Sequence, residues 1–148
     1  MKLETLTRRL LSVSPALRLA AAALLASGIL ALSGCDERKP APEVLLSKGR
    51  VKVAVKWRNQ YSNQSGTALG TAQNDKIGTF YFTGADNTEV FVKVLDFGPE
   101  KPYILFHGGL TDFEYAVTFT NVATGKSLTL KKDAGKLEGG LNNTDLAH

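Results

Sequence analysis

Cys35 is the residue whose chemistry and position together indicate a specific reaction. It is the only cysteine among the 148 residues, and it ends the sequence Leu32-Ser33-Gly34-Cys35 directly after an apolar run. A cysteine thiol is an intrinsically strong nucleophile, and Ser33 and Gly34 suit a peptidase groove that accepts only narrow side chains. The pattern predicts covalent attachment of a lipid to Cys35 and cleavage of the chain between Gly34 and Cys35.

The segment before Cys35 has the charge pattern of an export signal. Residues 1–18 carry four basic side chains and one acidic side chain, and residues 19–32 form a run of 14 residues without charge. That run is shorter than the ~20 residues that a membrane-spanning helix needs. A positive start, an apolar core and small residues at the cut are typical of a cleaved signal, so we predict a signal peptide over residues 1–34.

Residues 1 to about 40 resemble the signal and lipid-attachment box of bacterial lipoproteins. The resemblance implies a diacylglycerol and an N-acyl chain on Cys35, and no other cofactor. Because each buried methylene contributes about 0.8 kcal/mol, two or three chains hold a protein firmly on a membrane. The implied location is extracytoplasmic and membrane-anchored. Asp36 resembles the inner-membrane retention signal of enteric bacteria and favours the periplasmic face, while the outer membrane and the cell surface stay open.

Two alternatives concern the export signal itself. The chain could be an ordinary secreted protein with one leftover thiol. Separately, Thr7-Arg8-Arg9-Leu10-Leu11 partly resembles the twin-arginine signal, which exports folded proteins. The sequence leaves both the twin-arginine route and the general secretory route open.

The charge balance of the mature chain argues against nucleic acid as a partner. Four of the 18 basic and one of the 14 acidic side chains lie in residues 1–34, which leaves 14 and 13, a formal charge of +1. No basic patch of the kind that nucleic-acid binding needs remains. Lys52, Lys56 and Arg58 follow one face of a predicted strand, which is the usual pattern of the solvated side of an antiparallel sheet.

Three segments are predicted after the signal peptide. Residues 35–48 read as a lipidated, proline-containing tether, because Pro40 and Pro42 favour an extended spacer. Residues 49–133 are large enough for one hydrophobic core, which must hold without disulfides. Residues 134–148 contain Gly139-Gly140 and few large apolar side chains, so we expect a flexible tail.

The globular part has the two-residue period of β-strands. About seven such segments, separated by turn signals, predict an all-β fold, a single antiparallel β-sandwich with almost no helix. Residues 110–117 and 51–57 resemble strands of immunoglobulin and fibronectin type III folds. This resemblance implies that Tyr115 forms a tyrosine corner and that Trp57 lies in the core.

A closer resemblance covers residues 48–133. Trp57-Arg58, Gly78-Thr79-Phe80-Tyr81-Phe82, Asn87-Thr88-Glu89-Val90 and Val122-Ala123-Thr124-Gly125 are similar, in order, to an uncharacterised all-β module of exported bacterial proteins. That module has no assigned activity. The resemblance therefore implies a fold and an exported location but no reaction.

The motifs of catalysis and metal binding are incomplete. His107-Gly108-Gly109 is a fragment of the oxyanion loop of esterases, but no G-x-S-x-G nucleophile elbow accompanies it. No cysteine or histidine pair has zinc spacing, and the acidic residues of the turns are too sparse for a Ca²⁺ loop, although loops that converge in space could still bind Ca²⁺. We predict no catalytic residue and no metal ligand.

Binding of another molecule through exposed side chains is the function class that remains after catalysis and metal binding. An exposed aromatic side chain can anchor a protein or stack on a sugar ring, and the candidates are Tyr61, Tyr81, Phe97 and Tyr103. Residues 59–66 and 96–102 are the loops where we expect the contact. The sequence favours a lipid-anchored, non-enzymatic module that binds an envelope protein. The alternatives are a glycan or peptidoglycan binder and, less favoured, a small hydrolase built around His107.

Overall fold

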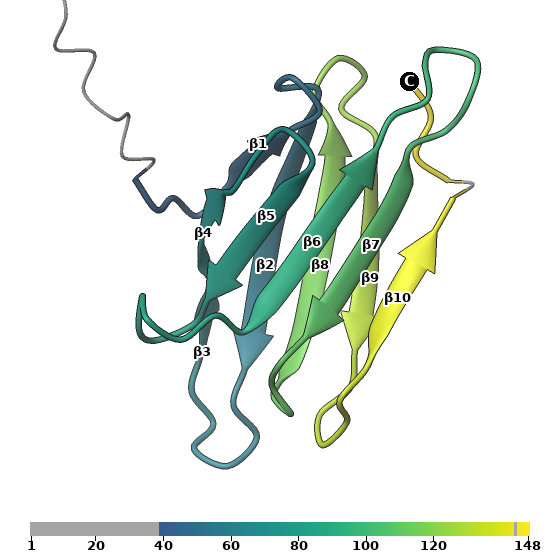
Figure 1. Cartoon of the computed structure of the whole chain (residues 1–148). Helices are drawn as coiled ribbons and strands as arrows, with labels where there is room; N and C mark the ends of the chain where they lie inside the picture. The colour runs from purple at the N-terminus through teal and green to yellow at the C-terminus, as the bar shows by residue number, and fades with distance from the viewer. Residues whose placement is uncertain (1–38, 144) are drawn as a thin grey trace, which may run out of the picture. The chain divides into compact units, whose positions relative to one another are not determined.

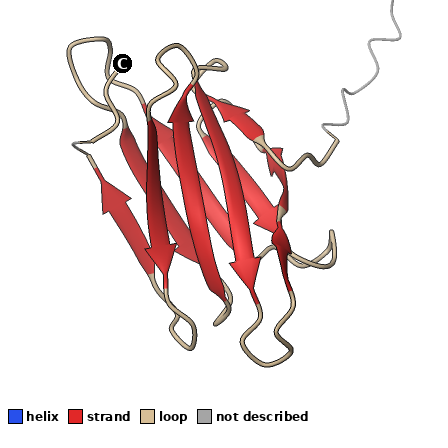
Figure 2. Ribbon diagram, turned by 180° about the vertical axis from the view of Figure 1, so that it is seen from behind, coloured by secondary structure: helices blue, strands red, loops and turns tan. Residues whose placement is uncertain are grey.

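The computed structural model describes residues 39–143 and 145–148. These residues form an antiparallel β-sandwich of two five-stranded sheets and contain no helix (Figures 1 and 2). The predicted all-β sandwich is confirmed, with ten strands in the described residues in place of about seven. The predicted signal peptide, Cys35 and Asp36 lie outside the described residues. No helix of the described part is long and apolar enough to cross a membrane.

The ten strands are short, and most of them alternate between buried and more exposed residues. Their bounds are β1 (Val44–Leu46), β2 (Val51–Arg58), β3 (Ser65–Thr67), β4 (Leu69–Ala72), β5 (Ile77–Tyr81), β6 (Val90–Leu95), β7 (Ile104–Gly109), β8 (Glu114–Asn121), β9 (Ser127–Lys132) and β10 (Gly139–Asn142). This period of two puts one face of each sheet against the other sheet.

The first sheet has the order β1-β2-β8-β9, with β3 also paired to β2. β2 and β8 pair over their whole length, from Val51 opposite Asn121 to Arg58 opposite Glu114. The second sheet has the order β10-β7-β6-β5-β4. Its middle strand is β6, as the apolar run of residues 89–95 predicts.

The core is the space between the two sheets. Its buried side chains are Val44, Leu46, Val51, Val53, Val55, Ala68, Phe80, Phe82, Val90, Val92, Val94, Tyr103, Leu105, Tyr115, Val117, Phe119 and Leu146. Trp57 packs against this cluster from its edge, and Tyr115 is 1% exposed. Tyr115 therefore lies in the core, whereas Trp57 is only partly buried at its edge.

The sandwich extends beyond the predicted range of 49–133 at both ends. At its start, β1 pairs with β2, and Ala41 pairs with Gly70 of β4. The predicted tether is thus wrong from Ala41 onward, because the alternating Val44 and Leu46 fill the core.

The predicted flexible tail is also wrong. β10 pairs with β7, and Leu146 is fully buried. The Tyr103 amide donates to the carbonyl of Leu146 at 2.9 Å. The glycines that suggested disorder instead allow close packing, since a Cβ at Gly140 would approach Nε2 of the His107 ring to 2.5 Å.

The strand directions divide the loops between two ends of the sandwich. The β2–β3, β7–β8 and β9–β10 connections lie at one end, drawn at the bottom of Figure 1. The β1–β2, β6–β7 and β8–β9 connections lie at the other end, together with the C-terminal residues. The two loops expected to form one contact, 59–66 and 96–102, are therefore at opposite ends.

Gly70 offers a test of the core packing. Its Cβ would overlap the ring of Phe80 and come within 2.9 Å of Val44 Cγ2, whereas a Cβ at Gly108 would meet nothing within 4 Å. We expect Gly70→Ala to reduce the free energy of unfolding by about 1–3 kcal/mol, the usual cost of overpacking. Gly108→Ala, the matched control, should stay within about 0.5 kcal/mol of wild type. Urea unfolding measures both, and equal values would contradict this packing.

Candidate functional site

Asp112 joins three loops at one end of the sandwich. Its carboxylate accepts a hydrogen bond from the Tyr61 hydroxyl at 2.5 Å and one from Gln60 Nε2 at 3.4 Å. Its main-chain carbonyl accepts from the Gly135 amide at 2.7 Å and from Gln60 Nε2 at 3.2 Å. We call residues 59–64, 110–113 and 133–138 the loop end.

The β2–β3 hairpin is held in shape by its own side chains. The carboxamide oxygen of Asn59 accepts from the amides of Tyr61 at 2.8 Å and Ser62 at 3.3 Å, the local turn that asparagine commonly forms. The Asn59 amide donates to the Gln64 carbonyl at 2.7 Å, and Asn63 has a positive φ of 57°. The hairpin therefore presents Tyr61 in a defined position.

Each loop of the loop end exposes one large side chain. Tyr61 is 74% exposed, Leu110 is 66% exposed and Leu137 is 75% exposed. The hydrogen bond to the Asp112 carboxylate raises the pKa of Tyr61. Exposed apolar groups on preorganised loops are suited to a protein contact, because little conformational freedom is lost on binding.

Three stacked aromatic rings lie between the core and the loop end. Trp57 stacks on Phe82 with ring centroids 5.2 Å apart, and Phe113 lies 6.2 Å from each of them. Trp57 Nε1 is buried and has no hydrogen-bond partner among the described residues. Trp57 lies on β2, Phe82 directly follows β5 and Phe113 directly precedes β8, so the rings close the core where the strands meet the loops.

Three buried polar side chains complete this end of the core. Tyr115 Oη lies 3.0 Å from His107 Nδ1 and 3.3 Å from the Glu138 carbonyl oxygen. Lys132 is 1% exposed and donates from Nζ to the carbonyls of Thr111 at 2.9 Å and Phe113 at 2.7 Å. Burial lowers the pKa of Lys132, although nearby carboxylates oppose this shift. The three groups thus bind one another or the main chain of the loops.

The hydroxyl contacts of Tyr115 correct its predicted role. A tyrosine corner bonds to the backbone a few residues upstream, whereas Tyr115 contacts the His107 ring and the carbonyl of Glu138. Tyr115 therefore joins β8 to β7 and to the segment before β10. It is a core residue but not a tyrosine corner.

His107 should make the fold sensitive to acid. Burial lowers its pKa, and the Glu138 carboxylate only partly opposes this effect. The unfolded chain, with a histidine pKa of about 6.5, then binds more protons, so stability is lost as pH falls through that value. We expect a smaller free energy of unfolding at pH 5.5 than at pH 7.5, with a weaker pH dependence in His107→Gln. An equal pH dependence in both proteins would contradict this assignment.

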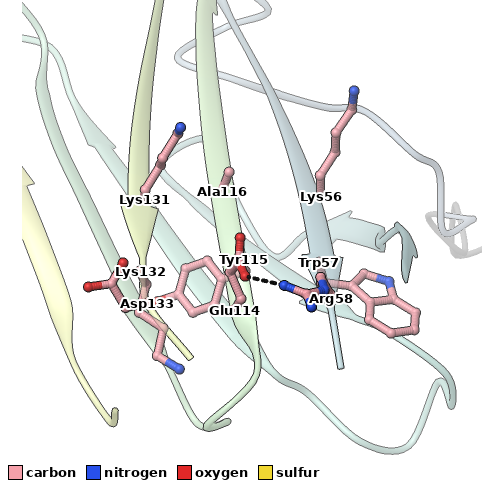
Figure 3. A pocket seen from close by; sticks show the side chains of 9 residues that line it. All are labelled: Lys56, Trp57, Arg58, Glu114, Tyr115, Ala116, Lys131, Lys132 and Asp133. Carbon is pink, nitrogen blue, oxygen red and sulfur yellow. Dashed lines mark hydrogen bonds and ion pairs between the residues drawn. The ribbon is translucent and has the colours of Figure 1, made fainter. Parts of the chain in front are cut away.

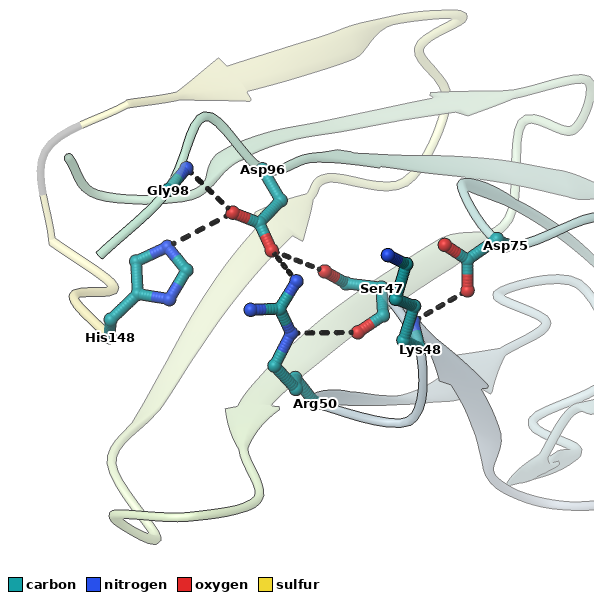
Figure 4. A network of polar contacts seen from close by, with 7 residues as sticks. All are labelled: Ser47, Lys48, Arg50, Asp75, Asp96, Gly98 and His148. Atoms are coloured by element: carbon teal, nitrogen blue, oxygen red, sulfur yellow. Dashed lines mark hydrogen bonds and ion pairs between the residues drawn. The ribbon is translucent and has the colours of Figure 1, made fainter. Parts of the chain in front are cut away.

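The opposite end is held by a network around Asp96 (Figure 4). The Asp96 carboxylate pairs with Arg50 and accepts from Ser47 Oγ at 2.8 Å and from the Gly98 amide at 2.9 Å. Nε2 of His148 lies 3.3 Å from Oδ1 of Asp96, at ion-pair distance but without hydrogen-bond geometry. Burial alone would raise the pKa of Asp96, but these partners outweigh it and lower the pKa. The network fixes the β1–β2 turn and the C-terminal residues.

The outer face of the first sheet is polar. Lys52 pairs with Glu43 at 2.9 Å and Arg58 pairs with Glu114 at 3.4 Å, as expected for a solvated face. A shallow hollow of about 290 Å³ lies on this face, and Figure 3 labels the side chains that line it.

Four residues were predicted as binding aromatics, and the structure separates them. Tyr61 is at the loop end, and Phe97, 59% exposed, is in the loop at the opposite end. Tyr81 is half-buried at the end of β5 in the second sheet. The prediction for Tyr103 is wrong, because it is 1% exposed and its ring packs 4.0 Å from the ring of His148. Tyr61 is therefore the more accessible of these two tyrosines.

Lys132, in the core next to the loop end, and Asp112, in the loop end itself, were not identified from the sequence. Lys132 continues the alternation of Leu128 and Leu130, and that period could have placed it in the core. No local pattern signals the joining role of Asp112, because Tyr61 and Gln60, which bond to its carboxylate, are 51 and 52 residues away. Long-range hydrogen bonds of this kind have no local pattern.

His148 is the histidine that approaches an acidic side chain in the described residues, that of Asp96. The partner of His107 is a tyrosine, and no group of three or more metal-ligating side chains occurs in residues 39–143 and 145–148. Comparison of the chain with protein-family models, curated proteins and solved structures finds no match. The function is therefore inferred from the geometry of the sandwich and from the sequence.

Proposed function

We propose that this protein is a lipid-anchored, non-enzymatic module of the bacterial cell envelope that binds a partner protein through its loop end. In this proposal Cys35 carries the lipid and residues 36–40 connect the anchor to the sandwich. Asp36 favours the periplasmic face of the inner membrane, with the outer membrane and the cell surface as alternatives. The proposal assigns the protein no nucleic-acid partner.

The single observation that carries the proposal is the joining of three loops by Asp112. Each loop presents one large exposed side chain, Tyr61, Leu110 or Leu137. Tyrosine is enriched among the residues that dominate binding energy at protein interfaces. Leu110 and Leu137 add apolar area, which favours a protein partner over a sugar.

A non-catalytic role is supported by how the polar side chains are used. Asp112 holds the loops together, and His107, Tyr115 and Lys132 form hydrogen bonds inside the core. A catalytic group must reach the reacting atoms, and His107 is only 9% exposed.

Site-specific photo-crosslinking in the native envelope tests the proposal. A photoreactive phenylalanine analogue at position 61 should capture one defined envelope protein, and Asp112→Ala in the same chain should reduce that capture. The matched control places the analogue at Phe97, which is also exposed but lies at the opposite end. Equal capture from positions 61 and 97, or none from position 61, would contradict a contact at the loop end.

A glycan is the second candidate ligand. The exposed Tyr61 ring has the Asp112 carboxylate and the Gln60 amide beside its hydroxyl, and an aromatic ring with polar neighbours can stack on a sugar. Calorimetric titration with soluble peptidoglycan fragments distinguishes the two candidates. Saturable binding that Tyr61→Ala abolishes would favour the glycan.

A further inference from the structure

The two outer faces of the sandwich differ in chemistry. The first sheet presents lysine, arginine and hydroxyl groups, with Thr118 bonded to Thr129 at 2.9 Å and Thr120 to Ser127 at 2.8 Å. The outer face of the second sheet presents mostly apolar side chains, with Thr79 and Lys93 among them. We call its apolar side chains the outer apolar face: Ile77, Phe91, Leu95, Ile104, Phe106 and Leu141.

The outer apolar face is accessible to solvent on the middle strand β6 and on the edge strand β10. Phe91 is 43% exposed and Leu141 is 56% exposed. Phe91 and Phe106 border a shallow hollow of about 310 Å³ that Gly108 also lines. A side chain at position 108 would extend into open space. Glycine at this position therefore leaves the hollow unfilled. An accessible apolar area on one face of a domain commonly marks a contact surface.

Lys93 limits what can cover this face. It stands between Ile77 and Phe106 in the cross-strand row, and its Nζ lies 5.9 Å from the Phe106 ring centroid. A second copy packed face to face would bring two buried Lys93 charges close together, which is unfavourable at low dielectric. A surface with both apolar and anionic groups suits the face better, because lysine can keep its amine at a polar boundary while its stem lies on apolar surface.

The chain first contacts the second sheet only a few residues after Cys35, the predicted site of the lipid. Ala41 pairs with Gly70 through two hydrogen bonds of 2.9 and 2.8 Å, and Gly70 lies on β4, the edge strand of the second sheet. Ala41 follows Cys35 by six residue steps, which reach roughly 20 Å when fully extended. A lipid on Cys35 would therefore keep the edge of the second sheet close to the bilayer.

We propose that the outer apolar face lies on the surface of the lipid bilayer, with Phe91 and Phe106 at the level of the acyl-chain boundary and Lys93 at the phosphates. This inference rests on the proposed lipid anchor at Cys35. Aromatic side chains with an adjacent cation are suited to that boundary. The loop end lies at the ends of the strands, so it stays open to a partner while the sheet contacts the membrane.

Fluorescence of the lipidated protein in vesicles tests the contact. Lipidation blocks the Cys35 thiol, so Phe91→Cys carries the one free thiol for an environment-sensitive fluorophore. The matched control is Thr118→Cys, on the outer face of the first sheet. The vesicles contain phosphatidylcholine with nitroxide-labelled acyl chains, with or without phosphatidylglycerol. Mass spectrometry of the peptide that contains Cys35 verifies the lipid, and thermal melting verifies that both variants fold.

We expect nitroxide quenching several times stronger at position 91 than at position 118. Phosphatidylglycerol should strengthen the quenching at position 91, and Lys93→Gln should remove that increase. Equal quenching at both positions in a verified lipoprotein would overturn the membrane contact and leave the proposed function intact. Shielding of position 91 that is independent of lipid would overturn it in favour of a second copy. Absence of lipid on Cys35 would overturn both proposals.

Discussion

Replacing Cys35 with serine is expected to abolish lipid attachment completely and to leave a precursor that retains residues 1–34. The reason is chemical, because Cys35 is the only thiol of the chain and a serine hydroxyl is a much weaker nucleophile. Anchoring should then be lost, since two or more acyl chains provide firm membrane attachment. Metabolic labelling with a fatty-acid analogue and the mass of the chain measure both effects.

Ser33→Ala is the matched control for this change. It alters the neighbouring sequence but keeps a small side chain before the cut, so labelling and processing should remain at the wild-type level. A Cys35→Ser chain that still incorporates the label would show that the lipid-attachment prediction is wrong.

Tyr115→Ala is expected to cost the domain about 3–5 kcal/mol of stability, the usual range for truncating a large buried aromatic side chain. Tyr115 is 1% exposed, its hydroxyl contacts His107 and the Glu138 carbonyl, and Lys132 Nζ lies 5.6 Å from the centroid of its ring. Because small domains are stable by only about 5–15 kcal/mol, much of the chain should unfold near physiological temperature. Urea unfolding followed by circular dichroism measures the loss.

Two further variants distinguish the stability contributed by the Tyr115 ring from that of its hydroxyl, and from the effect of removing an exposed tyrosine. Tyr115→Phe keeps the ring and should cost about 1 kcal/mol, the net contribution of a typical hydrogen bond. Tyr61→Ala removes an exposed tyrosine and should change stability by less than about 0.5 kcal/mol. A cooperative melt of Tyr115→Ala that matches wild type would mean that the core has been misassigned.

The strands of the sandwich could largely be predicted from their period. Val51, Val53 and Val55 alternate with polar residues, so β2 was apparent, and the apolar run around Val92 marked the central strand β6. The strands β1 and β10 were missed because they are only 3 and 4 residues long. The pairing of β10 with β7 is a long-range contact, and the glycine-rich sequence of β10 suggested a tail.

The candidate site was less predictable than the fold. Tyr61 could be named because an aromatic residue in a polar loop has few reasons to be buried. Tyr103 was misjudged since its burial depends on Leu146 and His148, about forty residues later in the chain. The grouping of the three loops by Asp112 depends on strand order, which the residue pattern alone does not determine.

The most direct test of the central claim is a binding titration with the envelope protein that position 61 captures. The lipidated chain should bind this protein saturably, and Tyr61→Ala should weaken binding by roughly 30-fold, the ratio for a loss of about 2 kcal/mol at an interface hot spot. Phe97→Ala, at the opposite end, should bind as wild type does. Equal affinities of Tyr61→Ala and wild type, or hydrolysis of the captured species that His107→Ala abolishes, would contradict a non-enzymatic contact at the loop end.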